Sequence, residues 1–135
     1  MINDDKNLIE SAIKARERSY CPYSGFSVGA ALLSSSGKVY TGCNIENSAF
    51  SPTICAERVA FFKAVEEGER DFVKIAVVGG KKGEPVKEET SPCGVCRQVM
   101  AEFCKGDFQI LTFDGEDIRR YSLSDLLPAS FGLKK

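Results

Sequence analysis

The chain has 135 residues, a net charge of −1 and no histidine. Its length fits one domain, and its near-neutral charge argues against a nucleic-acid or membrane partner, whose phosphates attract basic proteins. The lack of histidine excludes Ser-His and Cys-His catalysis and every imidazole zinc site. No apolar stretch reaches the length of a membrane span, and residues 1–6 are polar, so a cytoplasmic location is expected.

The first half of the chain alternates helical and strand patterns. Apolar residues spaced along 4–18 predict a helix, and the small apolar residues of 27–33 predict a strand. A turn at 35–37 leads to a second predicted strand over 39–44, which completes a hairpin. A loop containing Pro52 then precedes a predicted helix over 55–67, which ends at Gly68.

The second half continues this alternation. Residues 74–79 form a continuous apolar run, typical of a buried central strand, and 79–91 read as a surface loop. Pro92 introduces a predicted helix over 93–103, and strands over 108–113 and 118–121 flank an Asp-Gly turn. Ser122 caps a last short helix that stops at Pro128. This order predicts an α/β fold, with residues 1–135 forming a single layered domain around a mixed sheet.

Three cysteines form a metal-ligand pattern. Cys93 and Cys96 are three residues apart at a predicted helix start, where their Cβ atoms lie about 5–6 Å apart and two Zn–S bonds of about 2.3 Å can close the gap. Cys55 also stands at a predicted helix start, where partial positive charge favours the thiolate that a metal requires. Cys-x-x-Cys alone fits metal or redox chemistry equally, and the addition of Cys55 favours metal.

No further cysteine is placed to close the metal shell. Cys104 is eight residues after Cys96, which is about 12 Å along a helix and too far to share one ion. Cys21 and Cys43 lie before or within the hairpin and are interpreted as buried apolar residues. The fourth position is therefore expected to hold water, as in a catalytic zinc site.

Glu57 and Arg58 follow Cys55 in the sequence Cys-Ala-Glu-Arg. Because residues two apart lie on opposite sides of a helix, Cys55 and Glu57 can serve one site only beyond the helix N-terminus. There Glu57 would come within proton-transfer reach of a water on the metal, instead of only favouring the helix dipole. Three thiolates leave zinc with a net charge of −1, and we expect Arg58 to offset it by donating to a ligand sulfur.

Cys-Ala-Glu-Arg at 55–58 and Ser-Pro-Cys-Gly-Val-Cys-Arg-Gln at 91–98 resemble the zinc-dependent cytidine deaminases. Residues 23–32 are similar to that family's first strand, 42–47 to its nucleoside-binding segment and 126–131 to its C-terminal end. All-cysteine ligation resembles the short, homotetrameric branch of the family. The resemblance implies a three-layer α/β/α domain with a mixed five-stranded sheet.

The resemblance also implies a role for each site residue. Cys55, Cys93 and Cys96 would bind one Zn²⁺ per chain, and Glu57 would move protons between the zinc-bound water, ring N3 and the departing amino group. Zinc-bound hydroxide would attack C4 of cytidine or deoxycytidine, giving uridine or deoxyuridine and ammonia, in pyrimidine salvage. The nucleoside would be held by Phe26, Asn44, Ile45, Glu46 and Phe131, the last of them in a neighbour's site.

The spacing of Asn44 and Glu46 agrees with that reading. Residues two apart at a strand end face one side, which suits two contacts to one sugar. A carboxylate beside the sugar would also repel a phosphate, which favours a free nucleoside over a nucleotide or polynucleotide. Phe50 and Ser48 depart from the family, which often has Tyr and Ala there, in a segment that can meet a neighbouring subunit.

Three alternatives stay open from the sequence. The substrate can be another aminopyrimidine nucleoside, such as an antibiotic nucleoside. The chain can be a thiol oxidoreductase that uses Cys93 and Cys96 and needs no metal. It can also be a non-enzymatic module whose zinc only stabilises the fold, which requires a closed shell of four protein ligands.

Overall fold

The computed structural model describes residues 4–135, and residues 1–3 of the polar N-terminal stretch lie outside the described residues. The strands form one sheet in the order β2-β1-β3-β4-β5. β1 is antiparallel to β2 and β3, β3 is parallel to β4, and β4 is antiparallel to β5, so the predicted mixed five-stranded sheet is confirmed. In chain order the elements are α1 (Asp5–Arg16), β1 (Phe26–Ser34), β2 (Val39–Cys43), α2 (Ala56–Glu66), β3 (Phe72–Lys81), α3 (Gly94–Phe103), β4 (Gln109–Phe113), β5 (Ile118–Ser122) and α4 (Leu123–Leu126).

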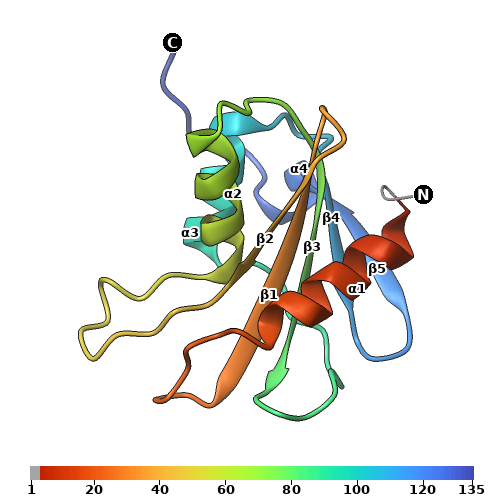
Figure 1. Cartoon of the computed structure of the whole chain (residues 1–135). Helices are drawn as coiled ribbons and strands as arrows, with labels where there is room; N and C mark the ends of the chain where they lie inside the picture. Colours follow the sequence, from red (N-terminus) through yellow and green to blue (C-terminus); the bar gives the residue numbers. More distant parts are fainter. Residues whose placement is uncertain (1–3) are drawn as a thin grey trace.

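Helices cover both faces of the sheet (Figure 1): α1 lies on one face, and α2 and α3 lie on the other. Alternate residues of β1 serve the two layers. Ala30 and Leu32 pack with the α2 and α3 side, whereas Ala31 and Leu33 pack with α1. Because both of their faces are buried, the central strands β1 and β3 contain continuous apolar runs, without polar alternation. Across residues 4–135, every helix is too short or too polar to span a bilayer.

The strand directions bring the starts of α2 and α3 to one edge of the sheet. β2 and β3 are both antiparallel to β1, so their carboxyl ends, Cys43 and Lys81, lie at the same edge. The chain then enters α2 from the end of β2, and α3 from the end of β3. β1 begins at this edge as well, because Phe26 pairs with Lys81. The topology therefore gathers Phe26, Cys55 and Cys93 from distant parts of the sequence.

Several predicted boundaries differ from the observed ones. β3 runs to Lys81 instead of ending at residue 79, since Phe26 and Ser27 extend its pairing with β1, and the following loop spans 82–93. The helices predicted from Cys55 and Cys93 begin one residue later. Both cysteines have an extended backbone, with φ −79° and ψ 154° at Cys55 and φ −70° and ψ 169° at Cys93, so each is the N-cap residue.

Replacement of Gly42 by alanine is expected to lower the free energy of unfolding by roughly 1–3 kcal/mol, the usual cost of overpacking a core. A Cβ at this position would lie 2.3 Å from the carbonyl oxygen of Ala56 and 2.7 Å from the amide nitrogen of Ala60. Both are backbone atoms of α2, so the helix itself would have to move away from the sheet. Denaturant unfolding of the variant measures the effect.

Gly132→Ala is the matched control for this change, because a Cβ there meets no heavy atom within 4 Å. Its stability should stay within about 0.5 kcal/mol of the wild type, as for most surface substitutions. Equal stability of the Gly42 and Gly132 variants would contradict the close approach of α2 to β2.

Candidate metal centre and active site

The three predicted cysteine ligands converge at the starts of α2 and α3. The Sγ atom of Cys93 lies 3.7 Å from that of Cys55 and 3.5 Å from that of Cys96. All three sulfurs lie within 4.8 Å of one another. Neither N-cap cysteine uses its side chain to cap its helix, so both thiols are free to turn toward the cluster. Cys96, in the first turn of α3, is fully buried beneath them.

Electrostatics favour a thiolate in this cluster. The pKa of the Cys55 thiol is lowered to about 5, chiefly by hydrogen bonding with Cys96 and also by the guanidinium of Arg58 and the thiol of Cys93, against the opposing effect of burial. Arg58 Nη2 donates to Cys55 Sγ at 3.5 Å. The cationic partner and the helix N-terminus thus stabilise negative charge on sulfur.

Glu57 lies in the first turn of α2 and is only 4% exposed. The pKa of its carboxyl group is raised to about 7, mainly by burial and also by the negative charge of Cys55. Hydrogen bonding with Cys96 and the positive charge of Arg58 act in the opposite direction. A carboxyl group held in this range can both accept and donate a proton near neutral pH. The structure therefore puts a proton carrier against the sulfur cluster.

This donor set fits zinc. Three soft sulfur ligands at such separations can share one ion through Zn–S bonds of about 2.3 Å. Within residues 4–135 the cluster contains only these three candidate ligands, which leaves one position of a tetrahedral shell for a non-protein ligand. Arg58, whose Nη2 donates to Cys55 Sγ, also has a buried Nε without a hydrogen-bond partner among the described residues, so this polar atom of the cluster's neighbour is unsatisfied. Three protein ligands, one remaining position and a buried carboxylate are the features of a catalytic metal site, so the site puts this protein in the class of metal-dependent hydrolases.

Asn44 lies directly after β2 and ties that strand to β1. Its Oδ1 accepts a hydrogen bond from the amide of Val28 at 2.8 Å, and its Nδ2 donates to the carbonyl of Phe26 at 2.9 Å. The second N–H of the amide group stays available for a ligand. The sequence did not predict this structural role, because it depends on the pairing of two strands.

Glu46 holds the turn that precedes β1. Its Oε1 accepts from the amides of Tyr23 at 2.9 Å and Ser24 at 3.2 Å, and its Oε2 accepts from the Ser24 hydroxyl. The Ser24 hydrogen bond is the main cause that lowers the pKa of Glu46, so the carboxylate is charged at neutral pH. Three donors leave about one of its four lone-pair sites free. A cavity of about 280 Å³ lies beside it, lined by Tyr23, Ser24, Glu46, Asn47, Phe50 and Thr53.

Phe26 begins β1, and Ile45 follows the end of β2 by two residues. The Phe26 ring is 42% exposed and covers Gly79, where a Cβ would lie 2.8 Å from the ring. Ile45 exchanges two backbone hydrogen bonds of 3.0 Å with Ile54, the residue before Cys55. The segment predicted to contact the nucleoside is therefore fastened directly to a metal-ligand segment.

Phe131 is not brought to this cluster. Its carbonyl oxygen accepts a hydrogen bond from Gln98 of α3 at 3.0 Å, and its side chain is 68% exposed. Farther along the tail, Lys135 reaches the carbonyl of Glu102, so the tail follows α3 away from its N-terminus. The predicted role of Phe131 in a neighbouring subunit stays a prediction.

The sequence left the role of Arg97 open, and the structure supplies contacts for it. Nε of Arg97 donates to the carbonyl of Pro92 at 2.7 Å, and Nη1 donates to the carbonyl of Leu126 at 2.7 Å. Arg97 thus joins the segment before Cys93 to the end of α4. The four-residue spacing between Cys93 and Arg97 was a usable signal for this role. Residues four apart are neighbours on a helix surface, so the Arg97 side chain is expected near the start of α3.

Comparison with known proteins agrees with this site. Residues 2–112 match the family described as the cytidine and deoxycytidylate deaminase zinc-binding region. A cytidine deaminase of Sporosarcina psychrophila is 54% identical over 95% of this chain and 91% of its own length, and one of Halalkalibacterium halodurans is 51% identical over 95% and 94%. The crystal structure of a Burkholderia pseudomallei cytidine deaminase is 44% identical, covers 95% of this chain and 99% of its own, and superposes with a TM-score of 0.86. The chain belongs to the zinc-binding cytidine and deoxycytidylate deaminase family.

Proposed function

We propose that this chain catalyses the hydrolytic deamination of cytidine and deoxycytidine to uridine or deoxyuridine and ammonia. The observation that carries this proposal is the convergence of three sulfurs within 4.8 Å of one another beside a carboxylate that is 4% exposed. Hydrolysis needs an activated water and a group that moves protons, and this site provides places for both. Membership of the zinc-binding deaminase family supports the same reaction.

Cys55, Cys93 and Cys96 are the proposed zinc ligands, with one ion per chain. When bound, zinc supplies the Lewis acidity that makes a water molecule nucleophilic near neutral pH. Three thiolates weaken this acidity by adding negative charge. The hydrogen bond from Arg58 to Cys55 supports a charge-tuning role for Arg58, since a cation on a ligand sulfur withdraws electron density from it.

Glu57 is the proposed proton carrier. The attacking water brings two protons, and the products require one on ring N3 and one on the departing amino nitrogen. Glu57 takes each proton from the oxygen that becomes O4 and returns it to the base, so that C4 gains a carbonyl oxygen and ammonia leaves. Its burial and its pKa of about 7 support this shuttle, because the carboxyl group exchanges protons in both directions with little free-energy difference.

Asn44, Ile45, Glu46 and Phe26 are proposed to form the nucleoside subsite. The spare donor of Asn44 and the spare acceptor site of Glu46 suit sugar hydroxyls, and the exposed Phe26 ring offers an apolar surface to the base. The charged Glu46 carboxylate would repel a 5′-phosphate, which supports a free nucleoside as substrate.

The alternatives have less support. A thiol oxidoreductase would use Cys93 and Cys96 alone, and gives no reason for the third sulfur or for a buried glutamate. A purely structural zinc site requires a fourth protein ligand, and the described residues offer only three in the cluster. Another aminopyrimidine nucleoside stays open as the substrate, and its turnover measured beside that of cytidine decides between the two.

Purified protein incubated with cytidine should release one ammonia for each uridine formed, with about one zinc per chain by elemental analysis. Loss of cytidine absorbance gives the rate, and an ammonia assay gives the balance. Cytidine 5′-monophosphate is the matched comparison, and its kcat/KM should be roughly 5–30-fold lower, because a phosphate near Glu46 adds roughly 1–2 kcal/mol of repulsion. Zinc-loaded protein that leaves cytidine intact would contradict the proposed function.

We also propose that residues 1–135 act as one domain, that four copies assemble, and that the enzyme works in the cytoplasm in pyrimidine salvage. One sheet shared by both helix layers supports the single domain. Phe50 is 91% exposed, Phe131 68% and Leu133 77%, and assembly would cover such exposed apolar side chains. Light scattering that gives the mass of a single chain would contradict the tetramer.

A further inference from the structure

The segment between β3 and α3 leads directly into two of the proposed zinc ligands. It spans residues 82–93 and has no helix or strand of its own. Among the described residues, no backbone–backbone hydrogen bond joins residues 85–92 to any other part of the chain. The position of this segment therefore depends on side-chain contacts, which in its second half involve Glu89, Ser91 and Pro92.

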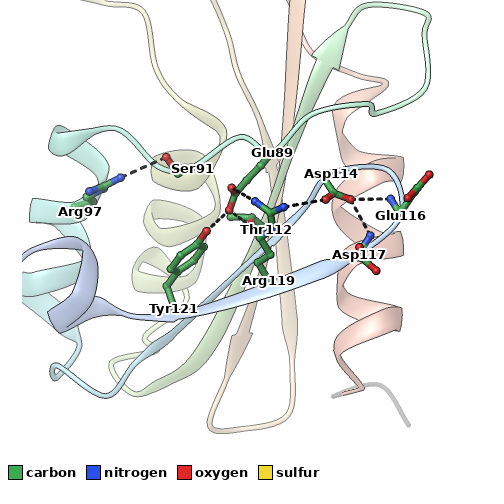
Figure 2. A network of polar contacts seen from close by, with 9 residues as sticks. All are labelled: Glu89, Ser91, Arg97, Thr112, Asp114, Glu116, Asp117, Arg119 and Tyr121. Atoms are coloured by element: carbon green, nitrogen blue, oxygen red, sulfur yellow. Dashed lines mark hydrogen bonds and ion pairs between the residues drawn. The ribbon is translucent and has the colours of Figure 1, made fainter.

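Glu89 makes the contacts that fasten this half to the sheet (Figure 2). Its Oε2 accepts from the Thr112 hydroxyl at 2.6 Å and from the Tyr121 hydroxyl, and its Oε1 accepts from Nη1 of Arg119 at 2.9 Å. These hydrogen bonds lower the pKa of the Glu89 carboxyl group, so it is charged at neutral pH. Hydrogen bonds to a charged group are about twice as strong as neutral ones.

The three partners of Glu89 belong to the neighbouring strands β4 and β5 of the sheet. Thr112 is fully buried in β4, where it pairs with Val77 of β3 and with Arg119 of β5. Tyr121 lies on β5 as well, two residues after Arg119. Loss of the Glu89 carboxylate would leave the buried Thr112 hydroxyl without this acceptor, so the contact is costly to break.

Only three residues separate Glu89 from Cys93. Pro92 is buried and its carbonyl accepts from Arg97, while Ser91 accepts from Nη2 of Arg97 at 3.4 Å. Arg97 belongs to α3 itself and so holds the segment to the helix, whereas Glu89 holds it to the sheet.

Thr90, beside Glu89, faces the proposed nucleoside subsite. Its Oγ1 and the Phe26 ring both lie over Gly79, at 2.7 Å and 2.8 Å from the position of a Cβ there. A shift of residue 89 would therefore move both a ligand sulfur and the side chain that borders the Phe26 ring.

We infer that Glu89 is a positioning residue that, through Thr112, Arg119 and Tyr121, fixes Cys93 for zinc retention and Thr90 for substrate binding. This inference rests on the proposed zinc ligands and nucleoside subsite. Outer contacts that orient metal ligands commonly change metal affinity or activity by about 10–100-fold when removed. The Glu89 side chain contacts Thr112, Arg119 and Tyr121, so its effect on the proposed zinc ligand Cys93 passes through the backbone of 90–93.

The test compares Glu89→Ala with Asp114→Asn in the zinc-loaded enzyme. Asp114 accepts from the same arginine at 3.4 Å and from the amides of Glu116 and Asp117, but its contacts stay within the β4–β5 turn and its strand (Figure 2). Zinc release to a chromophoric chelator should be about tenfold faster in Glu89→Ala and unchanged in Asp114→Asn. KM for cytidine should rise severalfold in the first variant only, and thermal unfolding should be compared in both.

A Glu89→Ala protein with wild-type zinc release and wild-type KM would overturn the inference, even if its unfolding temperature fell. Equal acceleration in Asp114→Asn would also overturn it, because the effect would then be general destabilisation. If Glu89→Ala fails to fold, Glu89→Gln and Thr112→Val carry the same comparison, with an expected severalfold faster release. Wild-type protein that binds no zinc would contradict the proposed ligands and not the contacts of Glu89.

Discussion

Glutamine in place of Glu57 is expected to lower kcat for cytidine by roughly 10²–10⁴-fold, the usual contribution of a positioned acid–base group. The amide has nearly the shape of the carboxylate but takes up no proton at neutral pH. Because the side chain is 4% exposed, bulk water has little access to replace it. The reaction would lose both proton deliveries, to N3 and to the departing nitrogen.

Zinc should stay bound in this variant, because the three sulfurs are untouched. Elemental analysis should therefore give about one zinc per chain in both proteins. Glu66→Gln is the matched control: it removes a glutamate from the same helix at an exposed position and should keep wild-type turnover. Comparable turnover in the Glu57 and Glu66 variants would remove Glu57 from the mechanism.

Serine in place of Cys96 is expected to remove zinc and activity together. Cys96 is fully buried and its Sγ lies 3.5 Å from that of Cys93, so the substitution exchanges a soft ligand for a hydroxyl that zinc binds poorly. Zinc content should fall well below one per chain after dialysis against a chelator. The unfolding temperature should fall too, because a ligand that binds only the folded state stabilises it.

Cys104→Ser separates metal binding from a general effect of removing a thiol from α3. Cys104 is the C-cap residue of that helix, and burial raises the pKa of its thiol to about 12, so it is neutral. Its sulfur is not part of the cluster. This variant should keep its zinc and its turnover, and loss of zinc from both variants alike would contradict the three-sulfur site.

The metal centre was predictable because local signals define it. Cysteines at two predicted helix starts, with the Cys-x-x-Cys spacing, indicate thiols that can share one metal ion. The exact helix starts were not predictable. Cys55 and Cys93 are N-cap residues with an extended backbone, and the same sequence pattern fits a helix that begins at either cysteine or one residue later.

Long-range polar contacts were the part that the sequence could not supply. Asn44 and Glu46 were predicted as sugar contacts, but most of their hydrogen-bonding capacity holds residues 23–28 in place. Glu89 reaches partners 23 to 32 residues away, and its sequence, a run of charged residues in a loop, is typical of solvent-exposed surface. Such contacts depend on strand register, which periodicity alone does not define.

X-ray absorption at the zinc edge of the wild-type protein tests the metal centre most directly. Three sulfurs at about 2.3 Å and one oxygen or nitrogen at about 2.0 Å are expected, from three thiolates and one non-protein ligand. A shell of four sulfurs would mean that another cysteine closes the site and no position is left for water. A shell without sulfur would mean that Cys55, Cys93 and Cys96 do not hold the metal.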